Sequence, residues 1–333
     1  MNVKNSLPLQ TLQLFGRLWV IGTSVIGTLV VWGFLFLFVM LRSSSDQVTE
    51  PSLNQKTLRQ NGPDKIAVVN LNGPIFDTDA GPFSGSDAAI SAQRVTHLLE
   101  KLQNADDVKA VILKINSPGG AVVASDEIYQ QVRLLQQHKV VVASLGDVAA
   151  SGGYYIASGA NKIVANPASI TGSIGVIAQL PQLSGLYEKI GVEMRTIKSG
   201  EFKDIGSESR DTTAEEQAIF DSIIKDSYDQ FIQAIVTGRK MDEASVRKLA
   251  DGRIYSGKQA KANGLVDELG DFQTTIKITE DLARISNATL VEYSDQSFFE
   301  SLLSSKFSNL SGLKVFEKMI PTQQFGIYYL LQI

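Results

Sequence analysis

The chain has 333 residues, of which 44% are hydrophobic and 20% charged, so it can bury a substantial core and is not a wholly disordered chain. Its 31 Lys and Arg residues against 35 Asp and Glu residues give a formal net charge of −4, which argues against nucleic acid as the main partner. There is no Cys and there are only two His residues, His97 and His138, so we expect no disulfide, no thiolate catalysis, no metal centre and no cofactor.

The N-terminal part contains one long apolar run. Residues 18–41 carry no charged side chain and, as a helix, are long enough to cross a hydrocarbon core of about 30 Å. No small-residue cleavage site follows, which favours an uncleaved single-pass anchor over a signal peptide. Lys4 and Arg17 precede the run. This bias predicts a single-pass protein of the cell (inner) membrane, with a cytoplasmic N-terminus over residues 1–17 and the bulk of the chain outside the cytoplasm.

Beyond the anchor, residues 42–64 are polar, contain Pro51, Gly62 and Pro63, and are predicted to be a solvated linker. Apolar runs that suit buried parallel strands follow at 65–71, 108–115, 139–145, 162–165, 174–178 and 193–197. Helical patterns separate the first three runs, and a longer helix begins at a capping box formed by Thr213 and Glu216. This alternation predicts an α/β domain with stacked parallel-sheet βα units, preceded by one transmembrane helix.

Two loops lie at the carboxyl ends of predicted strands, where open α/β sheets place their sites. The first is NSPGG, residues 116–120, and the second is residues 146–155, which contain Ser151. Taken alone, Pro-Gly-Gly is usually a turn, and a serine among small residues usually packs or caps a helix. Ala149 stands where the G-x-S-x-G pattern of α/β-hydrolases requires its first glycine.

A serine nucleophile needs a base. His97 and His138 fall among polar positions and are interpreted as solvated surface groups, so a Ser–His triad is poorly supplied. Lysine is the remaining base. Lys203 follows the predicted strand 193–197, although composition alone gives it no advantage over Lys198.

Five stretches, taken together and in this order, resemble the signal peptide peptidase A family: NSPGG (116–120), GDVAASGGYYIAS (146–158), TGSIGVI (171–177), IKSGEFKDIGSESR (197–210) and DGRIYSGKQAKANGLVDELG (251–270). The resemblance implies a Clp protease/crotonase-like fold, a catalytic domain over residues 65–285 and a C-terminal extension over 286–333. It further implies a membrane-anchored serine endopeptidase that degrades remnant signal peptides after their release from preproteins.

The same resemblance implies the site residues. Ser151 is expected to be the nucleophile, Lys203 the general base and Ser173 the residue that positions the lysine. The oxyanion hole is expected from backbone N–H groups of Gly119 or Gly120 and of Gly152. Members of this length form ring-like homo-oligomers, in which Lys203 can complete the site of a neighbouring subunit.

Such a dyad makes a physical demand on its lysine. An exposed lysine has a pKa near 10.4, and only the neutral amine accepts a proton, so a pKa of about 7 requires the ammonium to be destabilised by roughly 4 kcal/mol. Burial can supply this shift provided that no carboxylate pairs with the amine. Glu201 and Asp204 flank Lys203, and an ion pair between Lys203 and Asp204 would count against the assignment.

Two alternatives stay open at this point. A crotonase-like acyl-CoA enzyme would share the sheet and a similar oxyanion loop but would use acidic or other proton-transfer groups in place of a Ser–Lys pair. A non-catalytic membrane scaffold would leave Ser151 unreactive. The apolar end of the chain, FGIYYLLQI, could pack on a neighbour, enter the membrane interface or cover the groove.

Overall fold

The computed structural model describes residues 54–77, 89–294 and 328–330. The predicted anchor at 18–41 lies outside these residues. None of the helices in the described part of the chain combines the length and apolarity that a membrane crossing needs.

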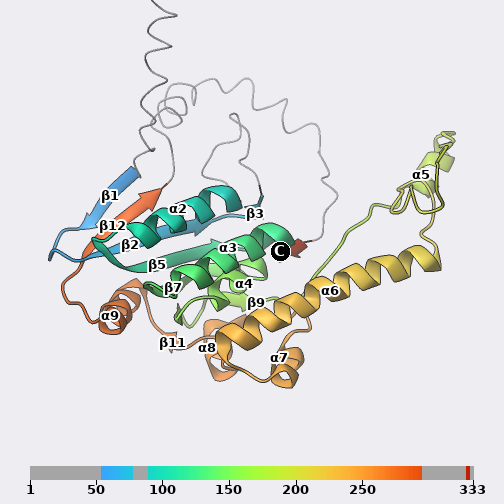
Figure 1. Cartoon of the computed structure of the whole chain (residues 1–333). Coiled ribbons are helices and arrows are strands. Elements are labelled where there is room, and N and C mark those ends of the chain that lie inside the picture. Colours follow the sequence, from blue (N-terminus) through green and yellow to red (C-terminus); the bar gives the residue numbers. More distant parts are fainter. Residues whose placement is uncertain (1–53, 78–88, 295–327, 331–333) are drawn as a thin grey trace, which may run out of the picture. The chain divides into compact units, whose positions relative to one another are not determined.

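Within the described residues, the main sheet has nine strands, and seven of them follow the order β1-β12-β2-β5-β7-β8-β11 (Figure 1). β9 pairs with β7, and β10 pairs with β9. The four pairs from β12 to β8 are parallel, whereas β1 runs antiparallel to β12. The strands are β1 (Asn54–Arg59), β2 (Lys65–Asn72), β5 (Val108–Ser117), β7 (Val140–Ala150), β8 (Lys162–Ala165), β9 (Ile170–Gly172), β10 (Ile254–Ser256), β11 (Glu268–Leu269) and β12 (Thr289–Ser294).

A second, smaller sheet lies beside the ends of the central strands. In the described part of the chain it has four strands in the order β13-β6-β3-β4. They are β3 (Ile75–Phe76), β4 (Ile90–Ser91), β6 (Gly119–Ala121) and β13 (Tyr328–Leu330). β6 belongs to the predicted NSPGG loop, so this small sheet holds one of the two candidate loops.

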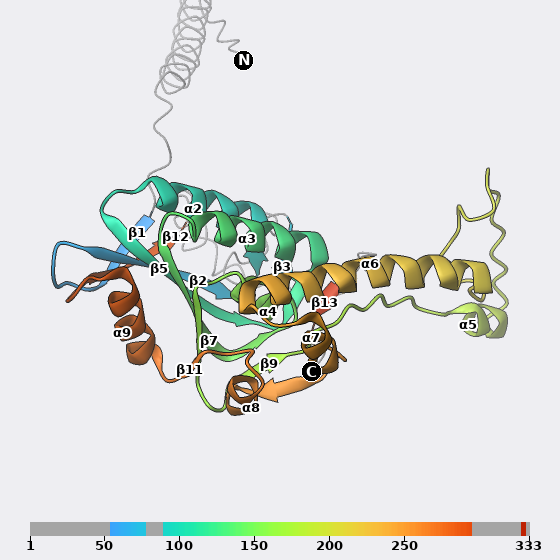
Figure 2. The same ribbon diagram turned by 60° about the horizontal axis from the view of Figure 1, so that its bottom comes forward.

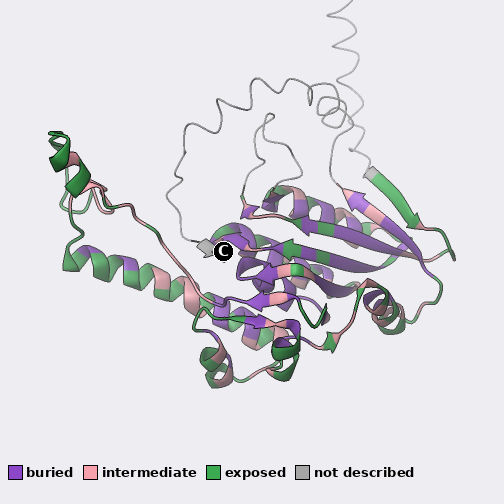
Figure 3. Ribbon diagram, turned by 180° about the vertical axis from the view of Figure 1, so that it is seen from behind, coloured by how far each residue is buried: buried purple, intermediate pink, exposed green. Residues whose placement is uncertain are grey.

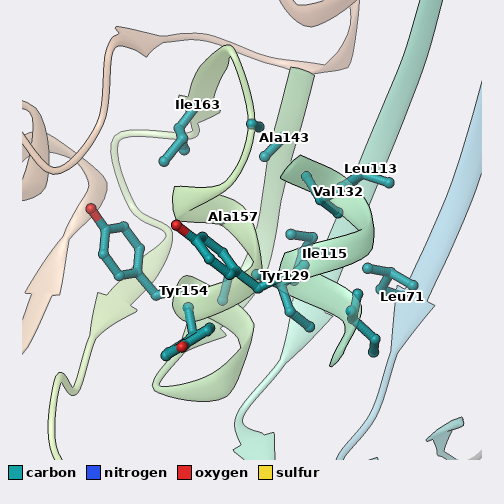
Figure 4. Packing of buried hydrophobic residues seen from close by; sticks show 14 of the residues in the cluster. Leu71, Leu113, Ile115, Tyr129, Val132, Ala143, Tyr154, Ala157 and Ile163 are labelled. Atoms are coloured by element: carbon teal, nitrogen blue, oxygen red, sulfur yellow. The ribbon is translucent and has the colours of Figure 1, made fainter. Parts of the chain in front are cut away.

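Helices cover both faces of the main sheet, which explains why its central strands are apolar on both sides. α2 (Ala92–Asn104), α3 (Val122–Leu135) and α4 (Gly152–Ser158) pack with the larger core, in which Leu71, Leu113 and Ile115 meet the tyrosines of α3 and α4 (Figure 4). α9 (Phe272–Ala283) covers the other face through Ile276, against Ile66 and Ile112. The predicted alternation of strands and helices is confirmed.

Two of the predicted strands were wrong. The strand expected at 174–178 is replaced by β9, which ends at Gly172 because Gly172 and Ser173 have φ values of 81° and 49°, in the left-handed region that extended chain does not use. Residues 193–197 form no strand: the side chains of Met194 and Ile197 are 58% and 92% exposed, and no described strand lies beside them to complete a ladder.

The sheet also extends past the bounds that the sequence suggested for the catalytic domain. β1 falls in the range expected to be a polar linker, and β12 falls in the C-terminal extension. These two strands pair with each other, and β12 joins them to β2. The folded body therefore includes segments from both sides of residues 65–285.

One part of the chain projects from this body. α5 (Ser184–Lys189) and the N-terminal half of α6 (Ala214–Arg239) stand away from the sheet, as Figures 1 and 2 show from two directions. We call residues 183–223 the arm. The C-terminal half of α6 packs on the body through Phe231, Ile232 and Ile235, and α7 (Glu243–Leu249) and α8 (Gly257–Ala262) follow it. The predicted capping box of Thr213 and Glu216 is confirmed at the start of α6.

The contact between α6 and α4 can be tested at Gly238. A methyl group there would lie 1.9 Å from the carbonyl oxygen of Ser158, so Gly238→Ala should lower the free energy of unfolding by about 1–3 kcal/mol or more. Gly185→Ala is the matched control, because no described atom lies within 4 Å of the added methyl and alanine favours a helix by about 1 kcal/mol. Denaturant unfolding measures both variants. Equal stability of the two would contradict the described contact.

Candidate active site

Ser151 lies on a sharp turn between β7 and α4. Its φ of 53° and ψ of −118° are unusual for a residue with a side chain, and such a conformation costs on the order of 1–3 kcal/mol. Strained strand-to-helix turns of this kind present the nucleophile in α/β-hydrolases. The Ser151 hydroxyl makes no capping hydrogen bond to the described residues of α4, so its role is not that of a helix cap.

The turn is held from both sides by backbone hydrogen bonds. The Ser151 N–H donates to the Gly172 carbonyl at 2.8 Å, and the Ser151 carbonyl accepts from the Tyr155 N–H at 2.8 Å. In the β7·β9 register Ala150 is the partner of Gly172, so Ser151 and Ser173 are the next residues along two adjacent parallel strands. The structure thus brings the predicted nucleophile and Ser173 together, and both are buried.

Two tyrosines fix the helix that begins at this turn. The Tyr154 hydroxyl donates to the Leu265 carbonyl at 2.8 Å, and the Tyr155 hydroxyl donates to Asp126 Oδ1 at 2.7 Å. Burial raises the pKa of Tyr154, so its phenol stays a proton donor. Sequence reasoning missed these anchors, because two adjacent aromatic residues after a Gly-Gly pair follow neither the helical nor the strand period. The only signal was their place directly after the candidate serine.

The three predicted oxyanion glycines converge on the same point. A methyl group at Gly152 would lie 3.2 Å from Gly119 Cα and 3.2 Å from Gly120 N. Gly119 has a φ of 103°, which glycine adopts readily, and its N–H donates to Ser117 Oγ at 3.1 Å. The loop is tied to the serine-bearing strand by Asn116, whose Oδ1 accepts from the Val148 N–H at 3.1 Å.

An extended segment from the C-terminal end lies on this loop. β13 pairs antiparallel with β6, with Tyr329 opposite Gly120 and Leu330 opposite Gly119. Of the placements left open for the apolar end of the chain, residues 328–330 therefore take the one over the candidate site. The backbone of the NSPGG loop is shaped to receive an extended main chain.

Lys203 lies elsewhere in the same chain. Its side chain is exposed, in a turn where the Lys203 N–H donates to the Gly200 carbonyl at 3.2 Å. This turn belongs to the segment between α5 and α6, and Figures 1 and 2 show that segment at the end of α6 that lies away from α4. A single chain thus brings together Ser151, Ser173 and the three glycines, while the arm holds Lys203 apart from them.

Asp204 does not pair with Lys203. Its carboxylate accepts from Arg210 Nη2 at 2.8 Å and Nε at 3.1 Å, and from Lys198 Nζ at 2.6 Å. Arg210 also donates to the carboxylate of Glu216. These partners hold the pKa of Asp204 well below its usual range, and Arg210 lowers the pKa of Glu216 to about 2. Among the described residues, no carboxylate forms an ion pair with Lys203.

The remaining candidates of the sequence are surface groups. His97 and His138 are exposed, as expected. Within the described ranges, no group of three or more His, Asp or Glu side chains is placed to hold a metal ion.

Comparison with known proteins adds independent findings. A Clp protease model matches residues 84–172, and a model for peptidase family S49 matches residues 133–286. A protein of Enterococcus faecium with the provisional name signal peptide peptidase SppA is 35% identical over 292 residues, covering 83% of this chain and 82% of that protein. A protein of Synechocystis with the provisional name of a protease is 45% identical over 68% of this chain and 74% of its own length. The chloroplastic serine protease SPPA of Arabidopsis thaliana is 38% identical over 70% of this chain and 35% of its own length.

The parallel-strand core, the strained serine turn and the glycine loop define a serine hydrolase of the α/β class with a Clp protease/crotonase-like fold. The chain belongs to peptidase family S49, the family of signal peptide peptidase SppA, and is a serine peptidase. The predicted resemblance is confirmed, and the acyl-CoA enzyme and the non-catalytic scaffold are set aside.

Two substitutions at Ser151 separate its chemistry from its backbone strain. Ser151→Ala and Ser151→Gly both remove the hydroxyl, and both should abolish peptide hydrolysis. Only glycine adopts the positive φ without strain. The free energy of unfolding of Ser151→Gly should therefore be about 1 kcal/mol larger than that of Ser151→Ala. Peptidase assays and denaturant unfolding measure the two effects. Residual turnover in Ser151→Ala would refute the assignment of the nucleophile.

The pH dependence of the arm follows from its two carboxylates. Because the pKa values of Asp204 and Glu216 are lowered in the folded state, their stabilisation is present above the ordinary carboxyl range and is lost as pH falls through the folded values. We expect the arm amides to stay protected from hydrogen exchange at about pH 4. Their exchange rates, corrected for intrinsic rates, should rise only as the pH approaches about 2. Loss of protection already between about pH 6 and pH 5 would contradict the described ion pairs.

Proposed function

We propose that Ser151 and Lys203 form the catalytic dyad of a membrane-anchored endopeptidase, and that its substrates are remnant signal peptides. The observation that carries the proposal is the Ser151 turn: a buried, strained serine whose hydroxyl does not cap its helix, directly beside three backbone glycines. Strain of this size persists at functional positions, where the surrounding structure enforces it.

The chemistry requires the neutral Lys203 amine to take the proton of the Ser151 hydroxyl as the oxygen attacks a peptide carbonyl. The resulting oxyanion accepts hydrogen bonds from the N–H groups of Gly152 and of Gly119 or Gly120, each donor lowering the barrier by about 3 kcal/mol. The lysine then returns the proton to the leaving amine. Lys203 then takes a proton from water as the water oxygen attacks the acyl-serine ester, and it returns that proton to the Ser151 oxygen as the acid product leaves. Ser173 positions the lysine throughout.

Of the oxyanion candidates, Gly152 has the strongest support. The Gly119 N–H already donates to Ser117 Oγ. The first N–H groups of a helix have no acceptor within the helix, and Gly152 is the first residue of α4.

A peptide substrate is supported by β13. Its antiparallel pairing with β6 places an extended main chain across Gly119 and Gly120, close to Gly152. Addition of a strand to an open edge is a general mode of peptide recognition, in which main-chain hydrogen bonds give affinity without regard to sequence. Signal peptides as the particular substrates are supported by the provisional name of the Enterococcus faecium relative and by the apolar run at residues 18–41.

That run supports an anchor in the inner membrane, with residues 1–17 in the cytoplasm and the peptidase outside it. An enzyme held at the bilayer meets peptides that remain in it. We include this location in the proposed function.

The site is proposed to be completed between subunits of a ring-like homo-oligomer. Lys203 is exposed in the single chain, whereas its role as a base requires a dry environment without a paired carboxylate. Figure 3 shows the arm as largely exposed, and six of its apolar side chains are 42–92% exposed: Leu186, Ile190, Val192, Met194, Ile197 and Phe202. Head-to-tail contacts of such an arm with the next subunit close into a ring when the rotation permits.

Subunit mixing tests this proposal. Ser151→Ala and Lys203→Ala subunits should each be inactive, yet coexpression at equal amounts should restore about one quarter of wild-type activity, because one interface in four then joins an intact Ser151 to an intact Lys203. A serine-directed phosphonate probe, read by mass spectrometry, should label Ser151 of the Lys203→Ala subunits in the mixture but not when these subunits are alone.

Two results would count against the proposal. A mixed oligomer without recovered activity would refute the shared site. Hydrolysis by Lys203→Ala subunits alone would refute Lys203 as the base.

A further inference from the structure

The arm keeps the carboxylate of Asp204 bound to residues other than Lys203. A carboxylate directly follows the lysine in the chain, and an opposite charge within a few ångströms would favour the ammonium form that cannot act as a base. In the structure the Asp204 side chain is turned to other partners and is 11% exposed. Arg210 donates three hydrogen bonds to Asp204: two to its carboxylate and one, at 3.3 Å, to its backbone carbonyl.

Arg210 also links the lysine turn to a rigid element. Its guanidinium donates to Glu216 Oε2 at 2.9 Å, and Glu216 is the capping-box residue that accepts from the Thr213 N–H at 3.0 Å. The Glu216 side chain is 2% exposed. One planar fork therefore bridges the residue next to Lys203 and the first turn of α6, a geometry that a lysine ammonium cannot reproduce.

We propose that Arg210 is a positioning residue for Lys203: it holds the Asp204 carboxylate away from the Lys203 amine and fixes the lysine turn to the start of α6. The inference rests on the proposed role of Lys203 as the general base. It adds a residue that touches neither the substrate nor the reacting atoms.

Charge balance gives the expected effect. The cluster contains two cations, Lys198 and Arg210, and two anions, Asp204 and Glu216. Loss of the guanidinium leaves one uncompensated negative charge beside Lys203. The other charged side chains of the segment from the lysine turn to α6 are Glu201, Glu208, Asp211 and Glu215, of which Glu208 accepts from Tyr187 and Asp211 from Gln182. These stay unchanged in the variants below.

The test is the pH–rate profile of peptide hydrolysis by the full-length oligomer. Arg210→Met should move the acidic limb of kcat/KM upward by about one pH unit and lower kcat/KM near neutral pH about tenfold, because the ammonium form of Lys203 is favoured. Arg210→Lys keeps the charge but loses the fork, so its acidic limb should stay in place while kcat falls. A residue that serves only stability would lower activity without moving the limb.

Double variants identify the carboxylate responsible. Arg210→Met with Asp204→Asn restores the charge balance at the residue next to Lys203 and should return the limb to its wild-type position. Arg210→Met with Glu216→Gln restores the same charge balance at a position farther along the chain from Lys203, and glutamine can still cap the helix. This double variant should return the acidic limb only part of the way to its wild-type position. Arg247→Met is the matched control, because Arg247 likewise bridges two carboxylates, Asp229 and Glu243, outside the lysine turn. Its pH profile should not move.

The outcomes separate the two proposals. If Lys203→Ala keeps its activity, the base assignment fails. If Lys203→Ala is inactive but Arg210→Met, folded and assembled by circular dichroism and gel filtration, keeps the wild-type limb, the role of Arg210 is refuted and the dyad stands. If Arg210→Met does not assemble, the Arg210→Lys profile decides: a shifted limb in this charge-conserving variant would overturn the proposal, and an unmoved limb with reduced kcat supports it.

Discussion

The geometry of the site depends on the hydrogen bond from the Ser151 N–H to the Gly172 carbonyl. A positive φ at a serine is unfavourable by itself, and a single hydrogen bond contributes only about 1 kcal/mol net. The bond is effective because β7 and β9 are already in register, with Ala150 opposite Gly172. Gly172 is the last residue of β9, and its carbonyl binds the N–H of Ser151, the first residue after β7.

The two halves of the proposed dyad are stabilised by different physics. Ser151 stands on a body whose core excludes water, between the buried α4 tyrosines and the strands of the main sheet. The turn that carries Lys203 has few apolar contacts of its own and is fixed by ion pairs among Lys198, Asp204, Arg210 and Glu216. Packing therefore determines the position of the serine, whereas ion pairs within the arm determine the position of the turn that carries the lysine.

Elements that depend on local sequence pattern were predicted correctly, whereas elements that depend on distant parts of the chain were not. β8 was predicted at 162–165 and lies at Lys162–Ala165, and the capping box at Thr213 was recognised, because both are encoded by local pattern. The missed end of β9 depends on a left-handed Ser173, and the absent strand at 193–197 depends on whether a partner strand lies nearby. Neither is local information. Ser151 could be singled out only by resemblance, since its backbone conformation, which distinguishes it from a packing serine, is not written in residue type.

The place of β12 in the main sheet has a consequence for synthesis of the protein. β12 lies between β1 and β2 in the sheet. The Arg59 side chain, at the end of β1, donates a hydrogen bond to the carbonyl of Ala288, 229 residues later in the chain. As the polypeptide leaves the ribosome, β2 can pair with β5 early, but its other edge stays open until the segment after α9 has emerged. Open strand edges recruit foreign strands, and contacts between distant residues form slowly. The nascent chain is thus most vulnerable to misassembly in the interval before β12 emerges, when β2, β5, β7 and β8 are already made and β2 still lacks its second neighbour.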